Sequence, residues 1–241
     1  MKDNDRVTWL AKLQDDRALI SRASTAQRVA EVLRARITEG ALLPGTRLSE
    51  EMIGAALGVS RNTLRESFRL LMHERLVVHE LNRGVFVRVL GVEDVIDIYR
   101  VRRVLECAAV ANARNSSPGA MEAIEAALTE GERAAAEQRW FDVGTANMQF
   151  HQAIAGLAAS PRVEEIMRQT LAEIRLAFHV MDAPQTFHQP YLERHRELLE
   201  LIRAGNVERA TAVLDAYLRT AERQLVDAYA ERMLDSAPAS R

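Results

Sequence analysis

Cysteine is almost absent from this chain of 241 residues, because Cys107 is the only one. A single cysteine excludes an intramolecular disulfide and a metal site built from several thiolates. Cys107 also falls within an apolar pattern of helical period, which indicates an inert buried thiol rather than a nucleophile. Redox chemistry is therefore not expected.

Long hydrophobic runs are missing as well. Charges interrupt the longest apolar stretches well short of the roughly 20 residues that a membrane-spanning helix needs. Residues 1–20 mix acidic and basic side chains and lack the apolar segment of a secretion signal. We therefore expect a cytoplasmic protein with no membrane partner. Its 48% hydrophobic residues are enough for one large or two modest domains.

The net charge is small, at −2, but the two signs are unevenly distributed. Residues 1–90 contain 15 Lys and Arg against 11 Asp and Glu, whereas residues 91–241 contain 17 against 23. The basic N-terminal part is therefore the candidate for contact with a polyanion such as DNA.

The first part of the chain shows the periodicity of two helices. Residues 25–40 carry an apolar stripe of helical spacing. Ser49 can cap a second helix, and the residues of this helix expected to face inward are Met52, Ile53, Ala56 and Leu57. Gly58 ends this helix and allows a tight turn.

A third helix and a hairpin follow the turn. Ser60 can cap a helix that runs to about Glu74. Residues 76–90 place β-forming residues on both sides of a turn at 82–84. The order helix, helix, helix, hairpin is typical of a winged helix-turn-helix.

The remainder of the chain is helical almost throughout. Turn residues divide it into six amphipathic helices, approximately 92–114, 119–137, 140–158, 161–181, 189–204 and 206–232. We therefore predict a mainly α protein, in which an N-terminal winged helix-turn-helix precedes an antiparallel all-α bundle. The expected segments are an N-terminal extension at 1–24, the winged helix-turn-helix at 25–90, the helical domain at 91–235 and a disordered tail at 236–241.

The helix that follows Ser60 has a basic face opposite an apolar face. Leu64, Phe68 and Leu71 recur at the spacing of a buried stripe, so the arginines between them face outward. An α-helix fits the major groove of DNA, and arginine pairs well with guanine edges. The alternative is an ordinary solvated face. The turn, the hairpin and the basic N-terminal part favour DNA, and the candidate contacts are Ser60, Arg61, Asn62, Thr63, Arg65, Arg69, Arg83 and Gly84.

Polar side chains recur within the apolar stripes of the second part, and these are Arg102, Glu106, Asn147, His151, His195 and Tyr217. Buried polar groups need partners, and a ligand or water in a cavity supplies them. The alternative is that each is an ordinary core residue paired with a neighbour, as Arg102 would be with Glu106. The other histidines are interpreted as ordinary residues, and they are His73, His79, His179 and His188.

Residues 42–87 resemble the N-terminal DNA-binding domain of GntR-family bacterial transcription regulators. Their sequence is LLPGTRLSEEMIGAALGVSRNTLRESFRLLMHERLVVHELNRGVFV. The all-helical ligand-sensing (FCD) domain of the FadR-type branch resembles three later segments: IYRVRRVLE at 98–106, NMQFH at 147–151 and ERHRELLELIRAGNVERA at 193–210. The resemblance implies a homodimer on a pseudo-palindromic double-stranded DNA operator. It also implies a small metabolite that changes DNA affinity by binding the domain at 91–235, which would also form the dimer.

The resemblance also implies roles for single residues. It places Ser60, Arg61, Asn62, Thr63 and Arg65 on the recognition-helix contacts, Arg83 and Gly84 on the wing, and His151 and His195 on the effector cavity. Where relatives often carry an arginine, this chain has Glu51, so the operator is expected to differ. Because Arg102 inside an apolar bundle needs a negative partner, we expect an anionic effector, for example a carboxylate. The expected regulator is a repressor.

A divalent ion of the zinc or nickel type is a further implication of the resemblance. Many sensing domains of this type hold such an ion with one aspartate and three histidines. The matching positions here are Asn147, His151, His195 and Tyr217. An amide and a phenol replace two strong ligands, so we expect either no ion or a weak site formed by Asn147, His151 and His195 and completed by water or by an effector carboxylate. In both cases these four residues are expected to line the effector pocket.

Two other function classes remain as alternatives. A helical metal-dependent enzyme would use the two histidines, but the chain has no HExxH or nucleophile motif, so an enzyme is not expected. A constitutive DNA-binding protein without an effector would leave the helical domain without a task. Release from DNA on effector binding would distinguish an effector-controlled regulator from this second alternative.

Overall fold

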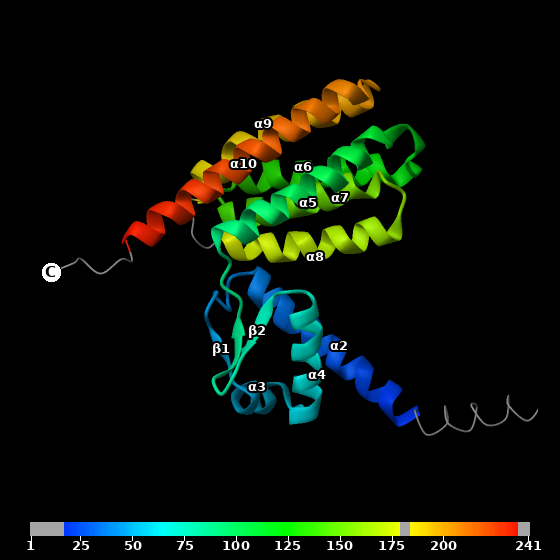
Figure 1. Ribbon diagram of the computed structural model, residues 1–241. Helices are drawn as coiled ribbons and strands as arrows, with labels where there is room; N and C mark the ends of the chain where they lie inside the picture. Colours follow the sequence, from blue (N-terminus) through cyan, green and yellow to red (C-terminus); the bar gives the residue numbers. More distant parts are fainter. Residues whose placement is uncertain (1–16, 179–183, 236–241) are drawn as a thin grey trace, which may run out of the picture. The chain divides into compact units, whose positions relative to one another are not determined.

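The computed structural model describes residues 17–178 and 184–235, and the chain forms two compact units that divide between Val89 and Leu90 (Figure 1). The boundary predicted between residues 90 and 91 lies next to this division. Residues 1–16 of the predicted extension and the tail predicted at 236–241 lie outside the described residues.

The described part of the first unit contains three helices and a three-stranded sheet. The helices are α2 (Arg17–Thr38), α3 (Glu50–Leu57) and α4 (Arg61–His73), and the strands are β1 (Arg47–Leu48), β2 (Val77–Glu80) and β3 (Gly84–Val87). The antiparallel sheet has the order β1-β3-β2. The helices and the hairpin occur in the predicted order, which confirms the winged helix-turn-helix.

The caps of α3 and α4 lie where the sequence predicts them. Ser49 Oγ accepts a hydrogen bond from the backbone N–H of Met52, and Ser60 Oγ accepts one from that of Thr63. Gly58, between the two helices, has a φ of 64° and ends α3 in the left-handed conformation. Local capping therefore determines where these two short helices begin and end.

Two elements of this unit differ from the prediction. Helix α2 begins at Arg17 rather than near Thr25, so it extends into the segment predicted as an extension. Strand β1 was not predicted, and it pairs with β3 so that Leu48 lies opposite Val85. A strand of two residues is too short to show an alternating pattern in the sequence.

The inward orientation expected for Met52, Ala56 and Leu57 is wrong, and Ile53 is only half-buried. Met52 is 74% exposed and Leu57 is 39% exposed. Gly54 faces α4 instead, because a Cβ added to it would lie 3.2 Å from Leu64 Cδ1. Met52 precedes Gly54 by two residues and is therefore about 200° away around the helix, on the side remote from α4.

The second unit is a helical bundle. Its described helices are α5 (Val92–Ala111), the short 3₁₀ helix η1 (Ala113–Asn115), α6 (Pro118–Ala136), α7 (Trp140–Gly156), α8 (Pro161–Ala177), α9 (Pro184–Arg203) and α10 (Val207–Asp235). All six predicted helices are present, which confirms the fold class, and Figure 1 shows α5, α7 and α8 side by side. None of the described helices combines the length and the apolar character that crossing a membrane requires.

Helix α9 begins five residues earlier than the predicted start at residue 189, and Pro190 lies inside it. Proline lacks a backbone N–H and usually marks the first turn of a helix, which is why the sequence pattern placed the start next to Pro190. Helix α8 ends at Ala177, and residues 179–181 of its predicted range lie outside the described residues.

One face of α7 carries polar candidates into the core. Phe150 and Ile154 are fully buried, and Asn147 and His151 lie among the same buried residues. Because residues three and four apart share one side of a helix, the apolar stripe of α7 also buries these two polar side chains.

Candidate functional site

The exposed side of α4 carries most of the predicted DNA contacts. The buried side consists of Leu64, Ser67, Phe68 and Leu71. The opposite side exposes Arg61, Asn62, Arg65 and Arg69. Thr63 Oγ1 lies 2.8 Å from Ser60 Oγ at the N-terminus of the helix, where free backbone N–H groups suit phosphate oxygens. The structure thus brings the predicted helix contacts to one face.

Carboxylates pair with two of these arginines. Arg65 Nε lies 3.0 Å from Glu50 Oε1, and Arg69 Nη1 lies 3.1 Å from Glu66 Oε2. Exposed ion pairs of this kind contribute only about 0–1 kcal/mol, so a phosphate or a base edge can replace the carboxylate at little cost. The side chain of Arg61 is exposed at the first position of α4.

The turn between β2 and β3 holds the predicted wing residues. Arg83 pairs with Glu80, and its guanidinium lies 5.4 Å from the centroid of the Phe86 ring. Gly84 has a φ of 109°, which favours glycine. A Cβ added to Gly84 would lie 3.5 Å from Nε of Arg47 on β1. Arg47 is thus a basic wing residue that the sequence pattern did not single out, because only strand pairing brings it there.

Five polar side chains from four helices form a hydrogen-bonded network inside the bundle. On α5, Arg102 Nε lies 2.8 Å from Glu106 Oε1. Glu106 Oε2 lies 2.5 Å from Nδ1 of His151 on α7. His151 Nε2 contacts the hydroxyl of Tyr217 on α10, which lies 3.0 Å from Nε2 of His195 on α9. All five side chains are buried, and we call this set the buried polar network.

Burial determines the charges in the network. It lowers the pKa of His151, although Glu106 opposes the change, and it lowers the pKa of His195 well below the usual range, so burial favours the neutral form of both imidazoles. Burial opposes ionisation of Glu106, but the contacts with His151 and Arg102 outweigh it and hold the pKa of Glu106 below its usual range. Burial raises the pKa of Tyr217, which keeps its proton. The network therefore contains one cation, Arg102, and one anion, Glu106.

Two buried polar atoms of the predicted effector residues have no hydrogen-bond partner among the described residues. They are Nη2 of Arg102 and Oδ1 of Asn147. Buried polar atoms of proteins are nearly always paired, with protein or with water. Arg102 therefore needs an acceptor oxygen, and Asn147 needs a donor.

Asn147 lies next to a histidine that was not selected from the sequence. Its Nδ2 is 3.4 Å from Nδ1 of His188 on α9. The expected position of His188 near a loop is wrong, because α9 begins at Pro184 and buries His188 in the bundle. His188 precedes His195 by seven residues, or about two helical turns, and this shared face was the available signal.

Arg175 of α8 is a further buried charged residue, and it was not selected from the sequence. Its guanidinium lies 4.5 Å from the centroid of the Phe141 ring and donates to the Phe141 carbonyl at 3.2 Å. Burial lowers the pKa of Arg175 to about 10, although Asp142 opposes the change. Gly144 makes room for this group, because a Cβ there would overlap Arg175 Nη1 and lie 2.9 Å from His188 Nε2.

The residues implied as metal ligands do not fit an ion. Within the described ranges, no group of three or more His, Cys, Asp and Glu side chains is arranged to hold a metal. Nε2 of His151 and Nε2 of His195 do point to one position, but the hydroxyl of Tyr217 occupies it. Asn147, the third residue of the implied weak site, contacts His188 instead.

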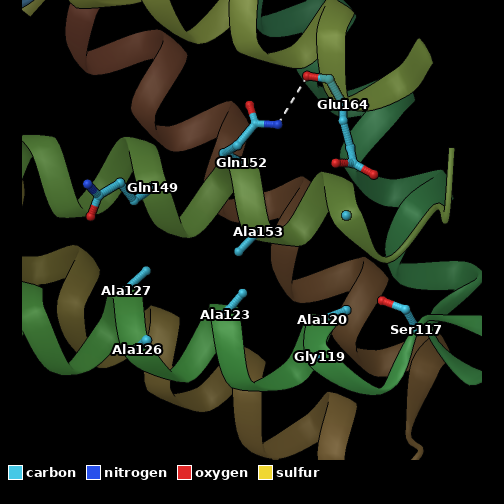
Figure 2. Close-up of a pocket in the computed structure, with 11 residues that line it drawn as sticks. Ser117, Gly119, Ala120, Ala123, Ala126, Ala127, Gln149, Gln152, Ala153 and Glu164 are labelled. Carbon is cyan, nitrogen blue, oxygen red and sulfur yellow. Dashed lines mark hydrogen bonds between the residues drawn. The ribbon is translucent and has the colours of Figure 1, made fainter. Parts of the chain in front are cut away.

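A surface pocket between α6 and α7 is separate from these residues. Figure 2 shows Ala123 of α6 and Ala153 of α7 facing each other across it. At one end Gln152 Nε2 donates to the Glu164 carbonyl at 3.0 Å. None of the predicted site residues lines this pocket, and its alanine walls offer few groups for recognising a polar ligand.

Comparison with known proteins covers both units. Residues 25–87 match the family model of bacterial regulatory proteins of the gntR family, and residues 97–220 match that of the FCD domain. A GntR-type transcriptional regulator from Rhodococcus sp. RHA1, known as a crystal structure, is 47% identical, with a TM-score of 0.80 over 86% of this chain and 99% of that one.

Curated relatives match over shorter spans. The gluconate operon transcriptional repressor of Bacillus subtilis is 41% identical over 87 residues, which are 36% of this chain and 35% of the repressor. The Nta operon transcriptional regulator of Aminobacter aminovorans is 31% identical over 139 residues, which are 56% of this chain and 64% of that regulator. These relatives are transcription regulators and not enzymes, which excludes the enzyme alternative. The chain therefore belongs to the gntR family of bacterial transcription regulators, with an FCD domain as its second part.

Proposed function

We propose that this regulator is a repressor that binds a pseudo-palindromic operator as a homodimer, and that a small anionic metabolite, bound at the buried polar network, changes its affinity for DNA. The observation that carries the DNA-reading part is the face of α4, where a buried apolar side forces the arginines outward. The name of the gluconate operon repressor supports repression.

Each part of the winged helix-turn-helix has a role in this proposal. Arg61 and Arg65 read base edges in the major groove, where the guanidinium fork matches guanine. Ser60, Thr63 and the first amides of α4 hold phosphates, and Arg83 contacts the minor groove or the backbone beside the wing. In a homodimer two copies of α4 enter major grooves about one helical turn apart, which requires a two-fold operator.

The test is operator binding by two arginine variants. An operator is first selected from random-sequence DNA, and affinity is then measured by fluorescence anisotropy at several salt concentrations. Arg61→Ala and Arg65→Ala are each expected to weaken specific binding by about 1–3 kcal/mol. Arg219→Ala is the matched control, because Arg219 is an exposed arginine of α10 that pairs with Asp215. Equal affinity of the wild type and both variants would contradict the proposed reading face.

The unpaired atoms at the network support the effector part of the proposal. Glu106 already balances the charge of Arg102 by accepting a hydrogen bond from Arg102 Nε. Nη2 of Arg102 is therefore left to donate to an oxygen of a carboxylate or a similar group. Oδ1 of Asn147 would accept from a donor group of the same molecule or from water.

The effector is sought with a panel of small carboxylates, scored first by thermal shift and then by release of operator DNA. Arg102→Lys keeps the charge beside Glu106 but removes the second donor of the fork, so it is expected to weaken the effector response at least tenfold while DNA binding remains. Arg103→Lys is the control, because the neighbouring Arg103 pairs with Glu222 of α10. An unchanged response in Arg102→Lys would remove Arg102 from the site. If no molecule of the panel alters DNA binding, the constitutive alternative is favoured.

A further inference from the structure

Two imidazoles of the FCD domain converge on a single point, as the ligands of a metal site do. Nε2 of His151 and Nε2 of His195 come from α7 and α9 and meet at one position. In a metal site that position holds the ion, about 2.0–2.1 Å from each nitrogen. Here the hydroxyl oxygen of Tyr217 stands at that point, covalently attached to α10.

Packing keeps the Tyr217 hydroxyl at this position. Tyr217 is 3% exposed, and its ring stacks on His151 at a centroid distance of 5.3 Å. The ring of Tyr191 lies 4.8 Å away and the ring of His195 lies 5.5 Å away in an edge contact. Any rotation of the phenol away from the imidazoles would need these neighbours to move, because protein interiors are close-packed.

The hydrogen-bond order is complete without an ion. Glu106, which pairs with Arg102 through its other oxygen, accepts a hydrogen bond from Nδ1–H of His151. This contact fixes the tautomer and leaves Nε2 of His151 as an acceptor. The Tyr217 hydroxyl donates to that nitrogen, and its oxygen accepts from Nε2–H of His195. Every one of these donors therefore has an acceptor.

The number of available ligands leads to the same conclusion. The imidazoles of His151 and His195 reach this position, but the implied third ligand, Asn147, contacts His188 instead. Within the described ranges, no group of three or more His, Cys, Asp and Glu side chains is arranged to hold a metal. Zinc sites use at least three protein ligands, so the wild-type residues fall short of a zinc site.

We propose that the Tyr217 hydroxyl takes the place of a metal ion in this FCD domain, linking α7, α9 and α10 by hydrogen bonds so that the domain is stable without metal. The residue at position 217 then decides between the two types of core. A third imidazole there, with the phenol removed, gives the two existing nitrogens a ligand set for zinc or nickel. This proposal concerns the helical domain alone and does not depend on the operator or on the effector.

The experiment uses the full chain prepared without a histidine tag, treated with EDTA and transferred to metal-free buffer. Wild type and Tyr217→His are titrated with Zn²⁺ and Ni²⁺, and binding is followed by calorimetry and by the melting temperature. The wild type is expected to bind no stoichiometric metal and to show no change in melting temperature with EDTA or zinc. Tyr217→His is expected to bind one equivalent of zinc with a rise in melting temperature of several degrees.

Two controls define the outcome. His151→Ala in the Tyr217→His background is expected to abolish the gained metal binding. Cobalt titration of the wild type, read by visible absorption, is a second measurement that does not depend on how well the variants fold, and no ligand-field band is expected. One tightly held metal ion in the wild type, or a zinc-dependent rise in its melting temperature, would overturn the proposal. So would a Tyr217→His protein with wild-type circular dichroism that still binds no zinc.

Discussion

At the scale of single residues, the absence of a side chain at Gly144 shapes the core of the FCD domain. Arg175 Nη1 and His188 Nε2 occupy the space that a Cβ at this position would need. A glycine inside a helix usually costs about 0.5–1 kcal/mol relative to alanine, so its presence in α7 indicates that the space is used. The positions of Arg175 on α8 and His188 on α9 thus depend on Gly144 of α7, which has no side chain.

We expect Gly144→Ala to destabilise the protein by about 1–3 kcal/mol, because two buried polar side chains must move to make room for the methyl group. The measurement is urea unfolding followed by circular dichroism. Gly156→Ala, in the last turn of the same helix, is the matched control, since a Cβ there would meet no atom within 4 Å. The control is expected to be neutral or slightly stabilising. A Gly144→Ala protein as stable as Gly156→Ala would show that the cluster tolerates the displacement.

The buried His188 makes stability depend on pH. Burial and the nearby Arg175 lower the pKa of His188 to about 4, whereas an unfolded histidine titrates near 6.5. Between these values the unfolded chain binds a proton that the folded chain does not, so stability is lost as the pH falls through this window. The loss from this group is about 2 kcal/mol at pH 5.

The comparison that checks this is urea unfolding at pH 7.5 and pH 5 for the wild type and His188→Gln. The variant is expected to lose less stability on acidification than the wild type. His73→Gln, at an exposed histidine of α4, is expected to follow the wild type. If the wild type and His188→Gln lose equal stability, His188 does not titrate in this window.

At the scale of secondary-structure elements, α4 depends on its N-terminal cap. Ser60 Oγ accepts from the Thr63 amide at 3.2 Å. We expect Ser60→Ala to reduce the free energy of unfolding by about 1 kcal/mol, because the first turn of α4 loses a hydrogen-bond acceptor. Ser60→Asn, which also caps well, should retain most of the stability in the same denaturation assay. A Ser60→Ala protein with unchanged stability would mean that the hydroxyl has no capping role, whatever its effect on DNA binding.

Elements with strong local signals were predictable, and those without them were not. The caps at Ser49 and Ser60 and the glycine turn at Gly58 act over three or four residues, so the sequence alone shows them. Strand β1 exists only because β3 pairs with it. The start of α9 was predicted too late because Pro190 lies inside the helix, whereas a proline in a sequence usually indicates the first turn of a helix.

At the scale of the whole molecule, we expect a homodimer. A chain of 27.0 kDa should sediment as a species of twice that mass, and residues 90–241 alone should also form a dimer, because the helical part is expected to form the interface. Analytical ultracentrifugation of the full chain and of this fragment, with circular dichroism as a check of folding, measures both. A folded fragment that sediments as a monomer would place the interface elsewhere, and a monomeric full chain at the concentration that saturates the operator would contradict the dimer.

Local patterns in the order of residues were enough to predict the winged helix-turn-helix, the six-helix bundle and the basic outer face of α4. They also selected Arg102, Glu106, His151, His195 and Tyr217 as polar residues on apolar stripes. Helical periodicity and capping depend on residues a few positions apart, so the order of residues is enough to show them.

The partners of these residues depend on how the helices pack in three dimensions. The position of the Tyr217 hydroxyl between two histidines depends on the rotation of α7, α9 and α10 about their own axes. The contact of Asn147 with His188 depends on where α9 begins, and the placement of Arg175 depends on the space beside Gly144. Contacts between residues far apart in the sequence depend on the close packing of several helices at once, which no local pattern encodes.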